Sequence, residues 1–261
     1  MTERAGELKA SLEFAVRVAR EAGDITLKYF KRSPTPELKA DNSFVTVADR
    51  EVEQHLRDRI GNVFPDDAVL GEEDGESSGT SGRRWIVDPI DGTFSFVHGV
   101  PMYGVMIGLE IEDEPVLGVL NVPALDELIF AARGLGCFHN GEPTAVSKVN
   151  SLDDALLLTS DLNVCDPDRE HSCRALLRNV SAVRTWGDCY GYLLVATGRA
   201  EIMLDPVMNI WDCAALLPIL EEAGGTFTDW EGRRTIDGGS AIATNGLLFN
   251  AVMNMVRESE C

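Results

Sequence analysis

Hydrophobic positions in the first sixty residues recur at helical spacing. Over Gly6–Lys31 they predict one long amphipathic helix. Thr46 and Asp49 have the spacing of a capping box, and apolar residues continue from there along one helical face to Ile60, which predicts a second helix. The Gly- and Ser-rich segment at 75–82 then predicts a flexible linker.

From Trp85 onward the pattern changes to short apolar runs separated by Gly, Pro and acidic residues, which predict strands of an antiparallel sheet behind the two helices. After about Asn150 predicted strands alternate with predicted helices, as is typical of α/β organisation. We therefore predict an α+β half over 1–150 and an α/β half over 151–261, closely packed together. The predicted strands are 68–70, 85–87, 103–110, 116–122, 128–132, 156–158, 182–184, 201–204, 226–229 and 241–243, and the helices of the second half are 170–178, 190–197, 212–223 and one at the C-terminal end.

Composition narrows the class of protein. The chain has 261 residues, of which 44% are hydrophobic, enough for a folded core. Its 23 basic and 43 acidic residues give a net charge of −20, which opposes binding to nucleic acid or to an anionic membrane. No apolar run reaches the length of a membrane span and the N-terminus lacks a signal-peptide pattern, so we expect a cytoplasmic protein. Its six cysteines show no CxxC spacing and are expected to be reduced and mostly buried.

Acidic residues gather at the expected ends of strands and starts of helices. Glu72 and Glu73 follow a short apolar run, and Asp88 and Asp91 close the next one. Asp212 starts an apolar helix. Each of these acids also has a purely structural interpretation. The residues Asp-Pro-Ile-Asp-Gly can simply form a turn, Asp212 can simply complement the dipole of a helix, and Glu72 can be a solvated loop residue.

The same acids would suit a particular chemistry if they converge. Several carboxylates cannot all stay ionised side by side without a compensating cation, and oxygen ligands without Cys or His suit Mg²⁺. The Ile90 carbonyl could be a further ligand, and the N–H groups of Gly92 and Thr93 at a helix start could face an anion. Metal ions on one side and amides on the other describe a phosphate-ester hydrolase.

Longer strings around these residues resemble the inositol monophosphatase family. The resemblance extends over about residues 8–256 and implies a layered αβαβα sandwich, Mg²⁺-dependent hydrolysis of a phosphomonoester and a homodimer. The strings are Gly71-Glu72-Glu73, Trp85-Ile86-Val87-Asp88-Pro89-Ile90-Asp91-Gly92-Thr93, Trp211-Asp212-Cys213-Ala214-Ala215 and Glu222-Ala223-Gly224-Gly225, together with Thr46-x-x-Asp49.

The resemblance also implies a set of metal ligands. Glu72, Asp88 and the Ile90 carbonyl would hold one Mg²⁺. Asp88, Asp91 and Asp212 would hold a second, and Glu72 would help to hold a weaker third. The expected cofactor is therefore two or three Mg²⁺ ions.

Glu72, Thr93 and Asp49 are the catalytic residues that the resemblance implies. Thr93 would help to activate the attacking water while Asp49 orients its hydroxyl, and the N–H groups of Gly92 and Thr93 would bind the phosphate. As a capping-box acid, Asp49 also has a purely structural alternative.

Two carboxylates are expected on the side of the leaving group. In the family this group lies near the positions of Asp188, Cys189 and Asp205, and a pair of carboxylates would suit a positively charged one. The alternative is that Asp205 merely ends a strand. The strings that begin at Gly92, Trp186 and Gly239 resemble the histidinol-phosphate phosphatase branch of the family.

We therefore predict a phosphatase acting on a small phosphorylated metabolite, L-histidinol phosphate. The chain departs from the branch at Phe94, where Lys is frequent. An inositol-1-phosphate phosphatase of broad specificity is the alternative. A catalytically silent cation-binding protein would have a broken carboxylate set, but Asp88, Asp91 and Asp212 are all present.

Overall fold

The computed structural model describes residues 2–32, 37–38, 44–160 and 170–257. Two 3₁₀ turns lie at Pro123–Leu125 and Leu152–Asp154. The helices of the described residues are α1 (Thr2–Tyr29), α2 (Val47–Val63), α3 (Thr93–Val97), α4 (Glu170–Arg178), α5 (Asp188–Ala196), α6 (Ile210–Ala214), α7 (Leu216–Glu222) and α8 (Phe249–Arg257).

The first half of the chain forms an eight-stranded sheet in the order β10-β9-β8-β7-β6-β5-β3-β4. Its neighbours pair antiparallel except for β3 and β5, which run parallel. A separate pair joins β1 (Glu37–Leu38) and β2 (Phe44–Val45). The strands of the large sheet are β3 (Ala68–Gly71), β4 (Gly75–Ser77), β5 (Arg83–Asp91), β6 (Gly104–Ile111), β7 (Glu114–Val122), β8 (Glu127–Ala132), β9 (Gly136–His139) and β10 (Glu142–Pro143).

The second half forms a five-stranded sheet in the order β12-β11-β13-β15-β14. Strands β12, β11 and β13 are parallel to one another, as expected where helices alternate with strands, and β15 is antiparallel to both of its neighbours. The strands are β11 (Leu156–Thr159), β12 (Ala182–Arg184), β13 (Ile202–Asp205), β14 (Thr226–Thr228) and β15 (Ala241–Thr244).

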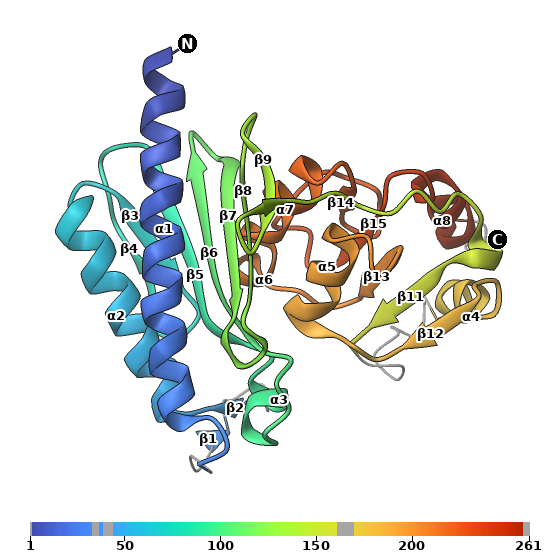
Figure 1. Ribbon diagram of the computed structural model, residues 1–261, viewed down its shortest axis with the longest axis horizontal. Coiled ribbons are helices and arrows are strands. Elements are labelled where there is room, and N and C mark those ends of the chain that lie inside the picture. The colour runs from blue at the N-terminus through green and yellow to red at the C-terminus, as the bar shows by residue number, and fades with distance from the viewer. Residues whose placement is uncertain (1, 33–36, 39–43, 161–169, 258–261) are drawn as a thin grey trace.

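The two sheets and the helices stack in five layers (Figure 1). One apolar cluster packs α1 and α2 on the outer face of the large sheet, a second fills the space around α5, α6 and α7 between the sheets, and a third packs α4 and α8 on the small sheet. This is the αβαβα sandwich predicted from the sequence, and it is confirmed. The large sheet ends before residue 150 and the small one begins after it.

Three sequence predictions about these elements were wrong in detail. The expected linker at 75–82 contains β4, a short exposed edge strand that only its pairing with β3 defines. The expected helix at 190–197 begins earlier, at Asp188. The helix at 212–223 is two helices, because Pro218 has no N–H to donate to the Ala214 carbonyl.

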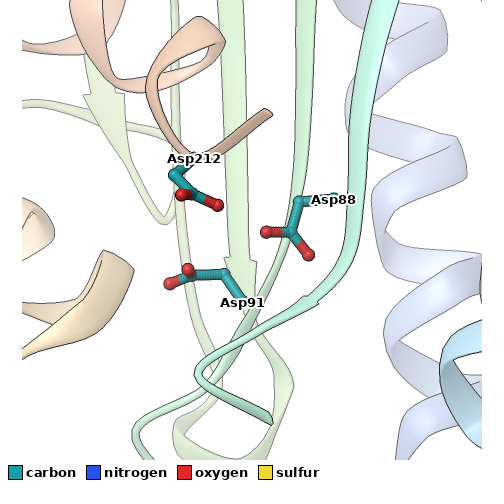
Figure 2. A group of neighbouring side chains, drawn as sticks. All are labelled: Asp88, Asp91 and Asp212. Atoms are coloured by element: carbon teal, nitrogen blue, oxygen red, sulfur yellow. The ribbon is translucent and has the colours of Figure 1, made fainter. Parts of the chain in front are cut away.

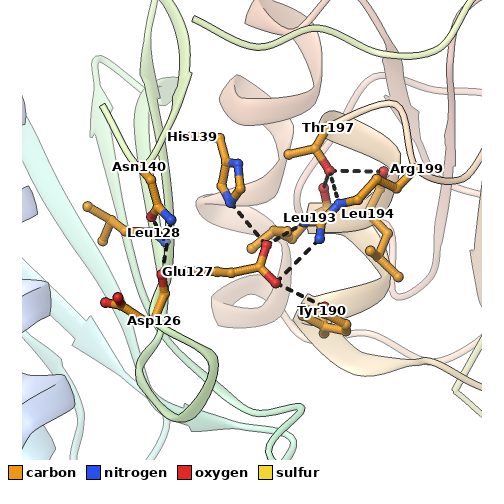
Figure 3. A network of polar contacts seen from close by, with 10 residues as sticks. All are labelled: Asp126, Glu127, Leu128, His139, Asn140, Tyr190, Leu193, Leu194, Thr197 and Arg199. Atoms are coloured by element: carbon orange, nitrogen blue, oxygen red, sulfur yellow. Dashed lines mark hydrogen bonds and ion pairs between the residues drawn. The ribbon is translucent and has the colours of Figure 1, made fainter. Parts of the chain in front are cut away.

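A polar network connects the large sheet with α5 and the turn after it (Figure 3). Glu127 on β8 accepts hydrogen bonds from Arg199 Nη2 at 2.5 Å and from Tyr190 OH at 3.0 Å, and pairs with His139 Nε2 at 3.0 Å. Burial raises the pKa of Glu127, but hydrogen bonds and the charge of Arg199 outweigh it and lower the pKa below its ordinary value. The ionised carboxylate therefore joins two elements that are far apart in sequence.

Two expectations from composition can be compared with the structure. No helix among the described residues is both long and apolar enough to cross a membrane. Three cysteines are buried free thiols, as expected: Cys137, Cys189 and Cys213. Cys165 and Cys261 lie outside the described residues.

Candidate active site

Three carboxylates from two distant parts of the chain converge between the sheets (Figure 2). Asp88 and Asp91 come from the end of β5, and Asp212 comes from α6. Their carboxylate oxygens lie within 4.8 Å of one another. The strand pairing explains how two aspartates three positions apart face one site. Asp88 pairs with Met106 and Asp91 with Gly104, so β5 carries one extra residue, a bulge, between them.

Local chemistry produces this bulge. Pro89 has no N–H for the strand ladder, and the Asp88 carboxylate accepts the N–H of Ile90 at 3.0 Å. Asp91 accepts the N–H of Cys189, in the first turn of α5, at 2.5 Å. The string is therefore the bulged end of a strand and not only a turn, and the bulge brings both carboxylates to the site.

The cluster carries unfavourable like charge. Asp88 is 1% exposed, and burial together with the charges of Glu72, Asp91 and Asp212 raises its pKa well above its ordinary value. Burial, Asp188 and Asp212 likewise raise the pKa of Asp91, and burial raises that of Asp212 to about 6. These carboxylates repel one another, which a cation between them would relieve.

Glu72 approaches the cluster from the neighbouring strand. It follows β3, which runs parallel to β5 with Gly71 opposite Val87, so the ends of both strands meet at one edge of the sheet. The Glu72 charge is the largest electrostatic contribution that raises the pKa of Asp88. Glu72 is nevertheless outside the trio whose oxygens lie within 4.8 Å of one another.

A buried glutamate that the sequence analysis missed holds the turn that carries Glu72. Glu53 on α2 is fully buried and accepts the N–H groups of Glu73 at 2.8 Å and Asp74 at 3.0 Å. Arg57 Nε donates to the same carboxylate at 2.8 Å. A Cβ on Gly71 would lie 2.3 Å from Glu53 Oε1, so only glycine allows this close approach.

Two of the predicted site acids are also helix caps. Asp49 Oδ2 accepts the Thr46 N–H at 2.8 Å, which confirms the capping box, while Asp49 Oδ1 lies 3.4 Å from the Thr93 hydroxyl. Asp212 Oδ2 accepts the Asn209 N–H at 2.6 Å in a second capping box. The structural and functional interpretations of these acids are therefore compatible, because a carboxylate has two oxygens.

Thr93 begins the short helix α3 directly behind the bulge. Its hydroxyl lies 2.9 Å from the Ile90 carbonyl, and burial raises the pKa of the facing Asp49 to about 6. Gly92 caps α3 with φ +79°, and a Cβ there would lie 3.0 Å from both Asp188 Oδ2 and the Met102 carbonyl. A side chain at position 92 would therefore close the space between α3 and α5.

Asp188, Cys189 and Asp205 lie together on the other side of the cluster. Asp188 has the left-handed φ of +53°, which non-glycine residues rarely adopt, and its N–H donates to Ser160 Oγ at 2.9 Å. Ser160 in turn donates its N–H to Asp205 Oδ1 at 3.3 Å. Tyr192 OH donates to Asp205 Oδ2 at 2.9 Å, and burial raises the pKa of Asp205 to about 7.

These residues enclose a cavity of about 140 Å³ that Asp91 and Asp212 also line. Sequence reasoning missed two of its walls, Ser160 and Tyr192, because they reach the site only through contacts with residues far along the chain. The cavity therefore places the acids of the second half next to the carboxylate cluster of the first.

The donor set of the cluster fits a hard divalent cation. Its atoms are carboxylate oxygens, they are close enough to share an ion, and their like charges need one. Beside them lie a hydroxyl with a carboxylate partner and the start of a helix. Fold and site together define a metal-dependent phosphoric monoester hydrolase.

Comparisons with known proteins agree with this class. A profile of the inositol monophosphatase family matches residues 7–260, and the chain belongs to that family. It is 48% identical over 252 residues to a histidinol-phosphatase of Chlorobaculum parvum (95% of this chain, 97% of the relative). A histidinol-phosphatase of Mycobacterium tuberculosis is 40% identical over 249 residues (93% and 96%). The crystal structure of the extragenic suppressor protein suhB from Bartonella henselae superposes with a TM-score of 0.89 at 30% identity, covering 95% of this chain and 99% of that one.

Proposed function

We propose that this phosphatase hydrolyses L-histidinol phosphate to L-histidinol and inorganic phosphate, a step of histidine biosynthesis. The observation that carries the proposal is the pair Asp188 and Asp205 in the cavity beside the carboxylate cluster. A leaving group with an ammonium needs opposite charge where it loses its water, whereas a neutral polyol does not. The names of the relatives at 48% and 40% identity support the same substrate.

Two or three Mg²⁺ ions are the proposed cofactor. Glu72, Asp88 and the Ile90 carbonyl would hold one, Asp88, Asp91 and Asp212 the second, and Glu72 would help to hold a weaker third. When bound, the ions neutralise charge on the phosphoryl group and acidify the attacking water.

The chain's own residues position the water and the phosphate. The Thr93 hydroxyl has one proton and two acceptors, the Ile90 carbonyl at 2.9 Å and Asp49 Oδ1 at 3.4 Å. It can accept a proton from the attacking water on a lone pair while its own proton passes to Asp49. The N–H groups of Gly92 and Thr93 bind the phosphate, since the first N–H groups of a helix have no acceptor within it.

The test is phosphate release with Mg²⁺ from L-histidinol phosphate and, in parallel, from inositol-1-phosphate. Asp88→Asn serves as the blank. We expect a clear preference for histidinol phosphate in kcat/KM. A preference for inositol-1-phosphate would overturn the charge argument and favour the alternative of a broad inositol phosphatase. Release from neither substrate, beside an active control phosphatase, would favour a silent cation-binding protein.

We also propose an oligomeric state, a cellular location and a division of the chain into domains. The working unit is a homodimer in the cytoplasm, and each chain consists of the halves 1–150 and 151–261. Light scattering of the purified protein tests the dimer, and fractionation of the source cells tests the compartment. Limited proteolysis tests the halves, because a domain boundary near residue 150 predicts early cleavage there.

A further inference from the structure

A second cavity adjoins the one beside the carboxylate cluster. Its volume is about 480 Å³, and it shares two wall residues with the first cavity, Ser160 and Asp188. The other walls come from α3, the segment after it and the segment before α5: Phe94, Ser95, His98, Val100, Met102, Thr185 and Gly187. Asp188 therefore stands between a carboxylate-lined cavity and one with an aromatic wall.

The aromatic wall is a stack of rings that is unusually open to solvent. Phe94 is 66% exposed, although a phenyl ring gains most when it is buried. It stacks on His98 with ring centroids 4.4 Å apart and on Phe44 at 5.9 Å. Neighbours thus fix the plane of the Phe94 ring while most of its surface stays available to a ligand.

His98 adds a directed polar group to this wall. Its Nδ1 lies 2.8 Å from the Phe94 carbonyl, which can only accept, so Nδ1 carries the proton. In the neutral ring Nε2 is then an acceptor. The wall therefore offers exposed aromatic surface together with one acceptor for an N–H.

We infer that this second cavity is the subsite for the imidazole ring of the substrate, with Phe94 and His98 as its specificity-determining residues. The inference rests on the proposed function. In L-histidinol phosphate the phosphate, the ammonium and the imidazole follow one another along a single short chain. The carboxylate cluster, Asp188 and the Phe94–His98 wall follow one another in the same order. An imidazole presents a flat ring and an N–H in each of its protonation states, and both match the wall.

The experiment compares two substrates that differ only in the ring, L-histidinol phosphate and L-alaninol phosphate, which has the phosphate and ammonium but no imidazole. For Phe94→Ala we expect the ratio of their kcat/KM values to fall about 3- to 10-fold toward the smaller substrate, mainly through KM. The inhibition constant of L-histidinol should rise by a similar factor. His98→Phe keeps the stacking but removes the acceptor, so it should lower the ratio less than Phe94→Ala does.

Phe138→Ala is the matched control, because Phe138 also belongs to a stacked pair, with Phe130 at 5.5 Å, but does not line either cavity. The imidazole subsite would be overturned if Phe94→Ala had the same ratio of kcat/KM values for the two substrates as the wild type. The proposed function would still stand if the wild type kept the preference for histidinol phosphate that it predicts. An equal loss on both substrates would make Phe94 a merely structural residue. Failure of the wild type to hydrolyse histidinol phosphate would overturn both.

Discussion

On the proposed metal side of the site, Asp88 and Asp91 lie three residues apart on one strand. On the proposed leaving-group side, Asp188 and Asp205 belong to different elements and are joined through Ser160. The first pair is organised by a local bulge, and the second by contacts across the fold. The difference teaches that one segment places two of the proposed metal ligands, whereas the proposed substrate contacts depend on how distant segments assemble.

The strongest way to test this division is to remove the carboxylate common to both proposed main ion sites. We expect Asp88→Asn to lower kcat/KM on histidinol phosphate and on inositol-1-phosphate alike, by more than the roughly 100-fold that changes around a metal site typically cause. Asp113→Asn, on an exposed turn, is the control. Substantial residual activity on either substrate would contradict the proposed ligand set.

The leaving-group side should show a large effect on stability instead. Burial raises the pKa of Asp205 to about 7, against an ordinary value of 3.8, so between these pH values the folded state holds a proton that the unfolded chain has lost. The free energy of unfolding therefore falls as pH rises from about 4 to 7. We therefore expect the free energy of unfolding of Asp205→Asn, measured by urea titration with EDTA, to rise relative to that of wild type by on the order of 2–4 kcal/mol as pH increases from about 4 to about 7.

Other buried acids also make the free energy of unfolding depend on pH in this range. Only the difference in this free energy between wild type and Asp205→Asn is therefore informative. Asp66→Asn, on the exposed surface, should follow the wild-type curve. Parallel curves for wild type and Asp205→Asn would show that the Asp205 carboxyl titrates normally.

A smaller effect is expected at Glu53, which holds the turn that carries Glu72 but is not itself a proposed metal ligand. Glu53→Gln keeps the shape of the side chain, but it replaces one of the two oxygens, which accept the Glu73 and Asp74 N–H groups separately, with an NH2 group that cannot accept a hydrogen bond. We expect the Mg²⁺ concentration for half-maximal activity to rise about 10- to 100-fold, the usual cost of a change behind the ligands. Glu51→Gln on the exposed face of α2 should not change it, and calorimetric Mg²⁺ titration provides a check independent of turnover.

The smallest effect concerns substrate choice. Asp188→Asn preserves the size of the side chain, and Asn tolerates the left-handed backbone there. The ratio of kcat/KM for histidinol phosphate over inositol-1-phosphate should fall about 10-fold, equivalent to about 1.4 kcal/mol. If both substrates lose activity equally, Asp188 belongs functionally to the metal side and the two sides are not separate.

Much of the fold and of the metal side could be predicted from the sequence because the signals are local. Helical periodicity marked α1 and α2, and the Asp-Pro-Ile-Asp string combines turn chemistry with two carboxylates in one short segment. Glu53 gave no such signal. In sequence it is one more acid on an amphipathic helix, and only its contacts with a turn twenty residues later show what it does.

The leaving-group side shows the same limit more strongly. Ser95 lies 3.4 Å from an oxygen of Asp188, ninety-three residues away, and Ser160 reaches Asp205 across forty-five. No spacing rule covers such contacts, because they depend on how the five layers stack. Strand β4 was missed for a similar reason, since its residues are polar and exposed and only β3 makes them a strand.

The double use of Asp49 and Asp212 has a consequence for how this protein can diverge. Each acid closes a capping box and also lies at the site: Asp49 Oδ1 is 3.4 Å from the Thr93 hydroxyl, and a carboxylate oxygen of Asp212 belongs to the cluster. A substitution that disables the chemistry at either position also removes a cap, which typically costs about 1 kcal/mol of stability. Descendants of this gene that lose activity should therefore retain these two aspartates longer than they retain Asp188, so the presence of Asp49 and Asp212 alone is a poor guide to which copies are still enzymes.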